Sequence, residues 1–410
     1  MDYVVDPEPT LFRGDIDAGP VVARLTDRAM TIGIGDDEVV SWDRAGRLFS
    51  MWTGGRTARR GLNGRGLEKW RDAAGRHRRS IEGGALDVLV DRAAGRAQAV
   101  AEALAARRCP EAAARSTEGA DLPEVLDRAA RFDASAARAD AQRFSGIYGE
   151  IGMLPPDQYL AMVVHATEGC AFNTCAFCEL YGRPFRVRTT AEFAGHLAEV
   201  RAYLGDSLLL RSRAVFLGAA NAVALPAARL LPMLQMITEM FGGRPPGISG
   251  FVDARSGARK SSGEYGALAA AGLRRVYVGL ESGHDPLLAF VRKPSTSDEA
   301  VQAVRAIKSA GIQVGVIVIV GLGGDRFADA HVSDTVATLN NMAAGAGDLI
   351  YFSDLVEPHD GQYAALAAAA SIGRLTPEEL VAQQRRIRAG LAFSSSPPTL
   401  ATYDMGEFVY

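Results

Sequence analysis

Cysteine is scarce in this sequence, and long apolar runs are absent. Only four of the 410 residues are cysteine, which argues against the disulfide framework of a secreted protein. No apolar run reaches the roughly 18 residues that a membrane-spanning helix needs, and the longest, VGVIVIVGL at 314–322, has the length of one buried strand. The segment MDYVVDPEPT lacks the basic-then-apolar pattern of a signal peptide. We therefore expect a cytoplasmic protein that does not contact a membrane.

Strong net charge and an early glycine-rich nucleotide motif are lacking too. The formal net charge is −3, so the chain as a whole has no electrostatic pull toward nucleic acid or an anionic membrane. No G-x-G-x-x-G follows an early predicted strand, and the nearest glycine cluster, GLGGD at 321–325, comes late in the chain. This pattern disfavours an open doubly wound sheet, which we keep as the alternative architecture.

Residues 1–80 predict a small β-hairpin followed by a basic region. Two alternating segments, EVVSW at 38–42 and RLFSMWT at 47–53, flank the turn sequence DRAG. Basic residues then predominate over 56–79, where the only acids are Glu68 and Asp72. The basic residues are Arg56, Arg59, Arg60, Arg65, Lys69, Arg71, Arg76, Arg78 and Arg79. Two interpretations stand: a solvated arginine-rich face, or a site for phosphate or nucleic acid in which Trp52 and Trp70 stack on bases.

Residues 81–150 are rich in alanine and arginine, with Leu or Val at helical spacing. They predict two or three helices. One helix is expected to begin after Asp121, because Glu124 follows three positions later as in a capping box. Together with the hairpin, these helices predict an α+β extension at the amino-terminal side.

From residue 151 the pattern changes to alternating strands and helices. Helix ends are expected before Gly272 and Gly311, and a last helix after Thr376. The predicted strands are 162–167, 214–218, 247–252, 274–280, 314–320 and 349–353. Their spacing fits one strand plus a crossover helix each. The sequence therefore predicts an α/β fold: a partial or full parallel β/α (TIM-like) barrel of about six βα units over 151–360, followed by a C-terminal helix and tail over 361–410.

Small and polar residues follow each predicted strand. The segments are GAANA at 218–222, DARSG at 253–257, ESG at 281–283, GLGGD at 321–325 and DLVEPHD at 354–360. In a β/α barrel the loops after the strands line one mouth, where chemistry gathers. This agreement places a candidate site at the carboxyl ends of the strands.

Three of the four cysteines, Cys170, Cys175 and Cys178, follow the first predicted strand. Thiolates are soft ligands that suit zinc or an iron–sulfur cluster. A structural zinc needs four protein ligands, and only Cys109 or a histidine such as His165 is left to complete that set. A [4Fe–4S] cluster normally takes four thiolates, so three thiolates leave one iron with an open coordination position.

The pattern Cys170-x4-Cys175-x2-Cys178, with Phe177 before the last cysteine, resembles the radical S-adenosylmethionine (radical SAM) superfamily. The resemblance is strongest in the segments 154–186 and 270–324, and the second segment resembles the fourth and fifth barrel units of the elongator-protein-3 and oxygen-independent coproporphyrinogen-oxidase type. The first spacing is four residues where the family usually has three, which marks a branch. The resemblance implies an oxygen-sensitive [4Fe–4S] cluster held by the three cysteines. S-adenosylmethionine would chelate the fourth iron and be cleaved reductively to a 5′-deoxyadenosyl radical, which abstracts a substrate hydrogen.

The resemblance also implies positions that contact the cofactor. Glu281 and Ser282 match ribose-contacting positions, for which the alternative is a helix start capped by Ser282 or Asp285. Lys293 would pair with the methionine carboxylate or be a solvated lysine. The other implied cofactor contacts are Phe177, Gly218, Ala219, Ala220, Asn221 and Gly321. His331, in DAHVSD at 329–334, is interpreted as a structural residue.

Residues on the loops of the mouth are substrate-side candidates, and none has a spacing that names a substrate. They are Glu179, Tyr181, Arg183, Asp325, Glu357 and His359. The first hypothesis is a radical SAM enzyme acting on a small molecule, with a flavodoxin or ferredoxin as electron donor. The second has RNA or a peptide as substrate, guided by the arginines of 56–79. The third is a non-catalytic iron–sulfur or zinc redox sensor.

Overall fold

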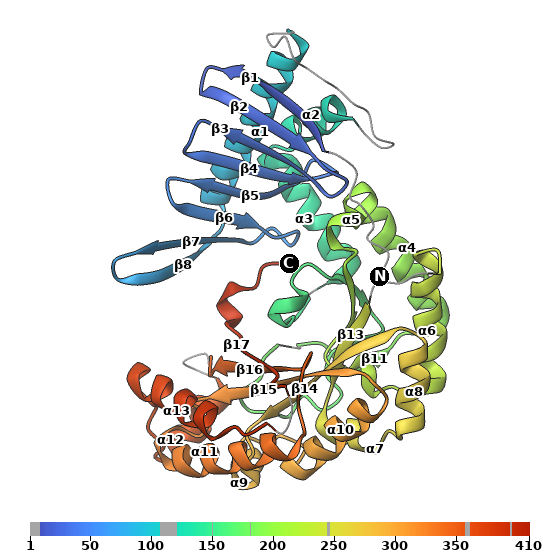
Figure 1. The fold of residues 1–410 in the computed structure, drawn as a ribbon, viewed down its shortest axis with the longest axis vertical. Helices are drawn as coiled ribbons and strands as arrows, with labels where there is room; N and C mark the ends of the chain where they lie inside the picture. Colours follow the sequence, from blue (N-terminus) through green and yellow to red (C-terminus); the bar gives the residue numbers. More distant parts are fainter. Residues whose placement is uncertain are drawn as a thin grey trace. The chain divides into compact units, whose positions relative to one another are not determined.

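The computed structural model describes residues 9–106, 121–149, 151–180, 182–243, 247–356, 361–393 and 396–410 (Figure 1). The chain divides into two compact units. Unit 1 comprises Met1–Ile151, Ala198–Arg213 and Glu407–Tyr410, and unit 2 comprises Gly152–Leu197 and Ala214–Gly406. No helix among the described residues is long and apolar enough to span a membrane.

Unit 1 is built on an antiparallel meander, which within the described residues has eight strands in sequential order. The strands are β1 (Thr10–Ile16), β2 (Gly19–Leu25), β3 (Ala29–Ile34), β4 (Glu38–Asp43), β5 (Leu48–Thr53), β6 (Arg56–Arg60), β7 (Gly66–Asp72) and β8 (Gly75–Ile81). The predicted hairpin is present as β4 and β5. The prediction of a single hairpin over residues 1–80 was wrong in extent, because this hairpin is only one part of a larger sheet.

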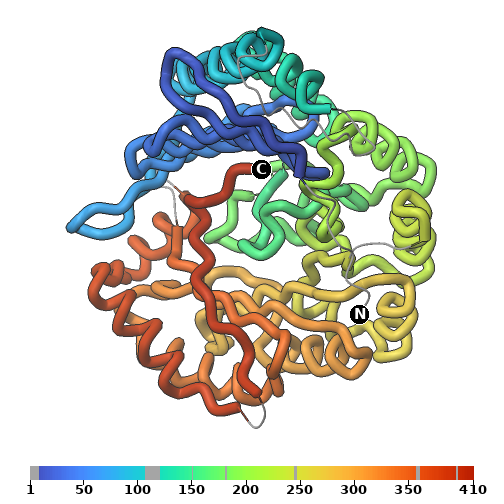
Figure 2. Tube along the Cα trace, turned by 45° about the horizontal axis from the view of Figure 1, so that its top comes forward, coloured from blue at the N-terminus to red at the C-terminus, as the bar shows by residue number. Residues whose placement is uncertain are grey.

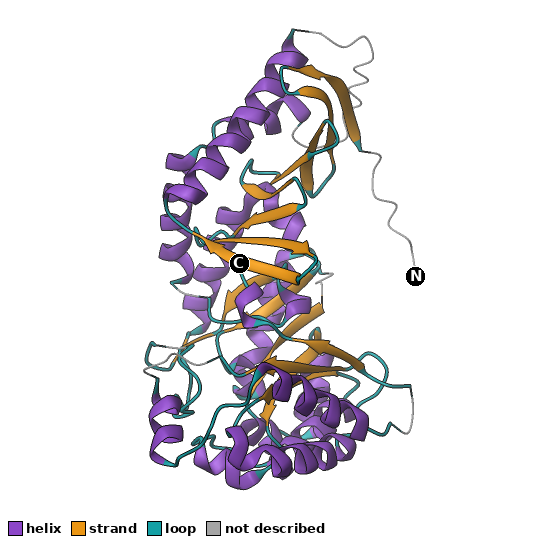
Figure 3. Ribbon diagram, turned by 90° about the vertical axis from the view of Figure 1, so that its left-hand side faces the viewer, coloured by secondary structure: helices purple, strands orange, loops and turns teal. Residues whose placement is uncertain are grey.

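Helices cover one face of this sheet (Figure 3). They are α1 (Gly84–Ala105), α2 (Leu122–Ala130) and α3 (Ala134–Tyr148). Apolar side chains such as Trp42 and Met51 point into the core between the sheet and these helices. The α2 helix begins where the sequence predicts, with the Asp121 side chain accepting a hydrogen bond from the backbone N–H of Glu124.

Most of the basic region 56–79 forms strands, and several of its cations have intramolecular partners. Arg60 is buried and donates to Asp140 at 3.2 Å. Arg56 stacks on Trp70 at 4.5 Å. Glu68 forms an ion pair with Arg79 at 2.7 Å. The exposed cations of this stretch are Arg56, Arg65, Arg71, Arg76, Arg78 and Arg79.

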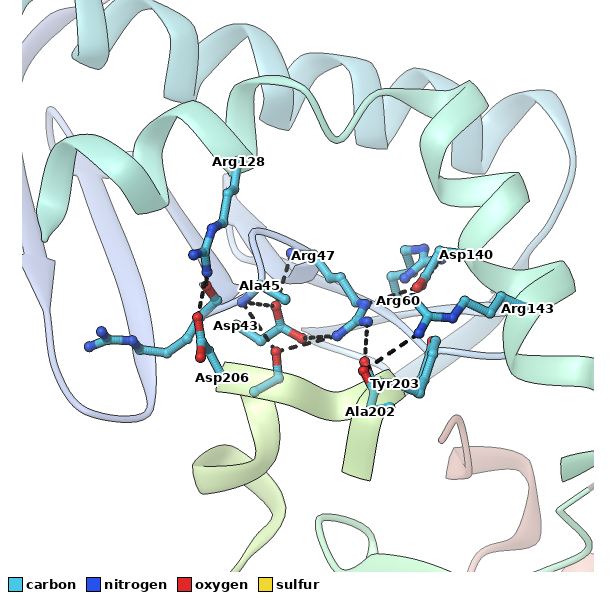
Figure 4. Close-up of polar contacts among 12 residues, drawn as sticks. Asp43, Ala45, Arg47, Arg60, Arg128, Asp140, Arg143, Ala202, Tyr203 and Asp206 are labelled. Carbon is cyan, nitrogen blue, oxygen red and sulfur yellow. Dashed lines mark hydrogen bonds and ion pairs between the residues drawn. The ribbon is translucent and has the colours of Figure 1, made fainter. Parts of the chain in front are cut away.

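A polar network, buried around Arg47 and more exposed around Arg128, ties the segment Ala198–Arg213 to the rest of unit 1 (Figure 4). The Arg47 guanidinium donates to the backbone carbonyl of Tyr203 at 2.6 Å and to Asp140 at 2.9 Å. It also lies over the Tyr203 ring at 4.5 Å. Arg128 donates to Asp206 at 2.6 Å. The last residues return to the same unit (Figure 2), where Arg211 stacks on the Tyr410 ring at 4.2 Å.

Unit 2 contains a parallel sheet, which has seven strands among the described residues, in the order β17-β16-β15-β14-β13-β12-β9. The strands are β9 (Met162–His165), β12 (Ala214–Gly218), β13 (Gly247–Val252), β14 (Leu273–Glu281), β15 (Gln313–Val320), β16 (Leu349–Asp354) and β17 (Thr399–Thr402). Every pair of neighbours is parallel. The predicted partial parallel β/α barrel is therefore confirmed, and its sheet includes one strand more than the six predicted.

The helices of unit 2 lie outside the curved sheet (Figure 1). They are α4 (Thr190–Leu204, whose last turns belong to unit 1), α6 (Ala227–Met240), α7 (Ala254–Arg259), α8 (Ser262–Ala270), α9 (Asp285–Phe290), α10 (Ser297–Ser309), α11 (Gly324–Asn341), α12 (Gln362–Ala369) and α13 (Pro377–Gly390). Gly272 and Gly311 have φ of +105° and +74° after α8 and α10, as predicted for helix ends. Thr376 and Glu379 form the predicted capping box of α13.

The Asp157 carboxylate connects several strands of unit 2 through hydrogen bonds. Asp157 accepts hydrogen bonds from the hydroxyls of Tyr277 and Tyr351 at 2.5 and 2.8 Å, and from the Arg275 guanidinium at 2.8 Å. Arg275 also donates to Gln313 at 2.6 Å. These contacts connect the segment before β9 to β14, β15 and β16, so Asp157 closes part of the curved sheet.

Candidate active site

The cysteine loop lies between two short paired strands, β10 (Thr167–Glu168) and β11 (Arg186–Val187). Gly169 has φ of +64°, and a Cβ there would lie 2.3 Å from the carbonyl oxygen of Arg183. Only glycine fits this close approach. The loop is held from its other side by the end of α9, because Ala176 N–H donates to the carbonyl of Val291 at 2.9 Å. The fold therefore fixes both flanks of the thiol-bearing segment.

All three loop cysteines line one cavity of about 400 Å³ at the carboxyl ends of the strands. Its polar lining comes from several strand ends, and the rest is mainly apolar. The described lining residues are Met153, Cys170, Phe172, Cys175, Phe177, Cys178, Glu179, Leu180, Ala220, Asn221, Phe251, Val252, Asp253, Gly279, Glu281, Lys293, Pro294, Ser295, Ile317, Ile319, Ser353, Asp354, Leu355, Val356, Tyr403 and Met405.

The thiols of the cavity sit in a mixed apolar and charged environment. Burial raises the pKa of Cys175 to about 11, and the Lys293 ammonium opposes that rise. Burial also raises the pKa of Cys178, while a backbone hydrogen bond with Leu180 lowers it. Without a metal the two thiols stay protonated at neutral pH, so their binding of metal releases protons.

The chemistry of the three sulfurs suits an iron–sulfur cluster. In the part of the chain that the structure describes, no set of three or more Cys, His, Asp or Glu side chains converges on one metal position. In a [4Fe–4S] cluster each thiolate binds a different iron, so the sulfurs need not converge. Cys170, Cys175 and Cys178 share one cavity and come from one short loop. This donor set suits a cluster with one iron left open.

Glu281 and Lys293 form an ion pair on the cavity wall. Lys293 Nζ lies 3.1 Å from Glu281 Oε1, and both side chains are nearly buried. Burial alone would lower the pKa of Lys293, but Glu281 raises it above its ordinary value. Lys293 therefore stays charged at neutral pH, and the ion pair holds it against the Glu281 carboxylate.

A second polar pair lines the cavity beside the first. The amide of Asn221 donates to the Asp253 carboxylate at 2.5 Å, and the Asp253 backbone N–H donates back to Asn221 Oδ1 at 2.8 Å. Asp253 also caps α7 by accepting from Ser256 N–H at 2.8 Å. The sequence placed Asn221 among the cofactor contacts and missed Asp253, although Asp253 directly follows a strand.

Eight of the predicted site residues line this cavity: Cys170, Cys175, Phe177, Cys178, Ala220, Asn221, Glu281 and Lys293, and so does the substrate-side candidate Glu179. Arg183 and Asp325 are exposed and are not among the lining residues. Tyr181, Glu357, His359 and Cys109 lie outside the described residues. The strand residues Phe251, Ile317 and Ile319 also line the cavity and were missed, because strands buried on both faces show no polar alternation to mark the inward face.

Gly218, Ala219 and Gly321 lie beside the cavity rather than on its wall. A Cβ on Gly218 would lie 2.6 Å from the His165 ring, so this glycine permits close packing of β12 on β9. Ala219 N–H donates to Thr167 Oγ1 at 3.1 Å. Gly321 N–H donates to Gln383 Oε1 at 2.7 Å. Their backbone groups hold neighbouring elements together.

Ser282 is buried and makes contacts away from the cavity. Its hydroxyl hydrogen-bonds with His331 Nδ1 at 2.8 Å and accepts from the His284 backbone N–H at 3.0 Å. The N-cap of α9 is His284, so neither Ser282 nor Asp285 caps this helix. His331 is fully buried, which agrees with its interpretation as a structural residue.

Two buried histidines next to the cysteine loop predict acid sensitivity. His165 of β9 stacks on His196 of α4 with ring centroids 5.6 Å apart. Burial lowers the pKa of each to about 3, and nearby Arg188 contributes. In the unfolded chain the pKa of each histidine is about 6.5, so below that pH the unfolded chain binds protons that the folded chain does not. The free energy of unfolding therefore decreases as the pH is lowered, by roughly 2 kcal/mol per histidine at pH 5. We expect a lower urea midpoint at pH 5 than at pH 7.

The matched control for this pH effect is His196→Phe, which keeps a stacked ring and removes one titrating group. Its urea midpoint should fall less between pH 7 and pH 5 than that of the wild-type protein. Equal losses in the two proteins would show that His196 does not titrate in this range.

Residues 164–335 match the profile of the Radical SAM superfamily. No curated protein matches the chain. Similar solved structures include the cobalamin-dependent S-adenosylmethionine radical enzyme OxsB, with 13% identity, a TM-score of 0.38, and coverage of 79% of this chain and 37% of that chain. The chain thus spans little more than a third of the length of OxsB.

Two further similar structures share a larger part of their own length with this chain than OxsB does. Coproporphyrinogen III oxidase (HemN) from Escherichia coli is 15% identical, with a TM-score of 0.40, over 61% of this chain and 54% of that chain. Methylornithine synthase (PylB) is 12% identical, with a TM-score of 0.38, over 65% of this chain and 75% of that chain. These likenesses are weak, and the strand order of unit 2 describes the fold by itself. The profile match, together with the cysteine loop on the cavity wall, identifies a radical SAM superfamily domain in this chain over residues 164–335.

Proposed function

We propose that the protein is a radical SAM enzyme that acts on a small molecule. One observation carries the proposal: the three cysteines share a cavity with the charged pair Glu281–Lys293 and with the inward-facing apolar residues of the sheet. Radical SAM domains use a [4Fe–4S] cluster and S-adenosylmethionine, which when bound supply reductive cleavage of the sulfonium and a carbon-centred radical.

The residues of this chain would hold the two cofactors from several strand ends. Cys170, Cys175 and Cys178 would bind three irons. The Glu281 carboxylate would accept hydrogen bonds from the ribose hydroxyls, and Lys293 would hold that carboxylate in place. Phe177, from the same loop as the thiols, would pack on the adenine.

The apolar part of the wall would hold the substrate. Phe251, Ile317 and Ile319 face the cavity from β13 and β15, and they would exclude water from a reactive radical. The described charged residues of the wall are Glu179, Asp253, Glu281 and Asp354 against a single cation, Lys293. This charge favours a neutral or cationic small molecule over a phosphorylated one.

The test is S-adenosylmethionine cleavage by anaerobically reconstituted protein with dithionite. We expect 5′-deoxyadenosine from the wild-type protein, and about a tenfold or greater loss of apparent affinity for S-adenosylmethionine in Glu281→Gln, because a charge-assisted hydrogen bond is replaced by a neutral one. A cluster whose EPR spectrum ignores added S-adenosylmethionine would instead support a redox sensor.

Nucleic acid is the second substrate class, favoured by the exposed Arg71, Arg76 and Arg78 of the β7–β8 hairpin. Binding of tRNA that weakens steeply with salt, and that is lost in Arg76→Glu/Arg78→Glu, would support it. Absence of tRNA binding at low salt would leave the small-molecule proposal standing.

A further inference from the structure

The turn that carries Glu281 has a strained backbone. Glu281 has φ of +61°, a region that residues with a Cβ rarely adopt. The backbone N–H of Ser282 donates to the carbonyl of Leu280 at 2.8 Å, which with the positive φ gives the pattern of a γ-turn centred on Glu281. The pairing of β14 with β15 also shifts register between Gly279 and Glu281. Such a conformation persists only when its surroundings hold it in place.

Helix α11 holds the residues that follow this turn. Thr335 Oγ1 accepts from the backbone N–H of Gly283 at 2.9 Å, and His331 Nδ1 hydrogen-bonds with Ser282 Oγ at 2.8 Å. His331 and Thr335 are fully buried. The turn also presses against the helix backbone, because a Cβ on Gly283 would lie 2.3 Å from the carbonyl oxygen of Asp334.

A third contact of α11 lies nearer the surface. His284 Nδ1 is 2.7 Å from the Asp334 carboxylate. Three consecutive residues after Glu281 are therefore bound to three side chains of one helix. On the cavity side, Lys293 fixes the Glu281 carboxylate itself. The three residues that follow Glu281 are thus held by α11, and the Glu281 side chain is held by Lys293.

Neither His331 nor Thr335 is among the residues that line the cavity. Thr335 can therefore influence a bound ligand through the turn, whereas His331 also interacts with the backbone of Ile319, which lines the cavity. The hydrogen bonds they make are buried, and losing one partner leaves a polar backbone or hydroxyl group without compensation.

We propose that His331 and Thr335 are positioning residues, which hold the γ-turn so that Glu281 presents its carboxylate to the ribose of a nucleoside ligand. The inference rests on the proposed function for the identity of that ligand. It assigns to α11 a part in ligand recognition, although no residue of α11 is among those that line the cavity.

The probe is 5′-methylthioadenosine, a nucleoside without the amino-acid group that would chelate iron. Its binding to the full-length protein is measured by equilibrium dialysis and compared with that of its 2′-deoxy counterpart. The wild-type protein should prefer the ribose form. Thr335→Val removes the hydroxyl at nearly constant volume, and we expect it to lose about tenfold in affinity for the ribose form and little for the deoxy form.

Thr335→Ser is the matched control, because it keeps the hydroxyl that accepts from Gly283; its preference should stay within about twofold of the wild-type value. His331→Asn, whose amide can replace Nδ1, should keep more of the preference than His331→Leu. Hydrogen exchange over residues 279–284 in ligand-free protein gives a second readout. It should be faster in Thr335→Val than in Thr335→Ser.

Two failures can be told apart. A wild-type protein that binds neither nucleoside would contradict the ribose contact of Glu281, and with it both proposals. A Thr335→Val protein that keeps the wild-type preference for ribose, with a lowered melting temperature alone, would show that α11 only stabilises the fold and would overturn this inference.

Discussion

Cys175→Ala is expected to abolish both cluster binding and S-adenosylmethionine cleavage. Cys175 is partly buried on the cavity wall, and alanine would leave one iron without a protein ligand, which a cluster already open at another iron would not survive. We expect the iron content after anaerobic reconstitution to fall to background, with a loss of 5′-deoxyadenosine production of at least about 100-fold. The measurements are iron and sulfide analysis together with chromatography of the nucleoside product.

Cys109→Ala is the control for that experiment, because Cys109 is the one cysteine of the sequence outside the loop. It should keep the iron content and activity of the wild-type protein. Full activity in Cys175→Ala would exclude this loop as the cluster site. Zinc bound stoichiometrically by the wild-type protein would point to a structural or sensing role instead.

Asp157→Ala is expected to cost roughly 2–4 kcal/mol of folding stability. The substitution leaves the partly buried Arg275 guanidinium without its carboxylate and removes the acceptor of the Tyr277 and Tyr351 hydroxyls. Removing one partner of this partly buried network leaves the other polar groups without compensation for part of their desolvation cost. Burial first, and then Asp157, raises the pKa of both tyrosines, so they act as neutral donors at neutral pH. Urea unfolding measures the loss.

Tyr351→Phe is the matched control within the same network. It removes a single donor and keeps the ring packed on Tyr403, with centroids 5.6 Å apart, so a loss of about 1 kcal/mol is expected. If Asp157→Ala cost no more than Tyr351→Phe, the carboxylate would not be the centre of the network. Both proteins should keep the cysteine loop, which lies at the opposite ends of the strands.

The fold of unit 2 could be predicted because its strands are buried on both faces. Segments such as VGVIVIV at 314–320 have no polar alternation and are bounded by helix-ending glycines. The sheet of unit 1 is covered on one face only, so its outer face carries charge. Strands such as β6 (RTARR) and β8 (GRHRRSI) therefore present arginines where a strand is usually recognised by apolar residues. We therefore interpreted this stretch as a basic patch and did not predict its strands.

Some residues of the candidate site could likewise be proposed from the local sequence, and others could not. The spacing of the three cysteines in one loop indicated a common ligand set, and the structure places all three on one cavity wall. Glu281 and Lys293 could be placed only through the family resemblance, and the structure brings them together at 3.1 Å. The Ser282 hydroxyl hydrogen-bonds with His331, and the Gly321 backbone N–H donates to Gln383, so neither group is available to the cavity. These partners lie about 50 to 60 positions away in the sequence, and no local sequence pattern predicts such contacts.

The interleaving of the two units has a consequence for protein engineering. The segment Ala198–Arg213 belongs to unit 1, although it interrupts unit 2 and lies within residues 164–335. An excised fragment beginning at residue 152 would keep Tyr203 and Arg211 but lose Arg47, the partner that holds the Tyr203 carbonyl. Such a fragment should aggregate through the uncovered stretch. Grafting this barrel onto another scaffold would demand either the amino-terminal sheet as a companion or a redesigned linker in place of 198–213.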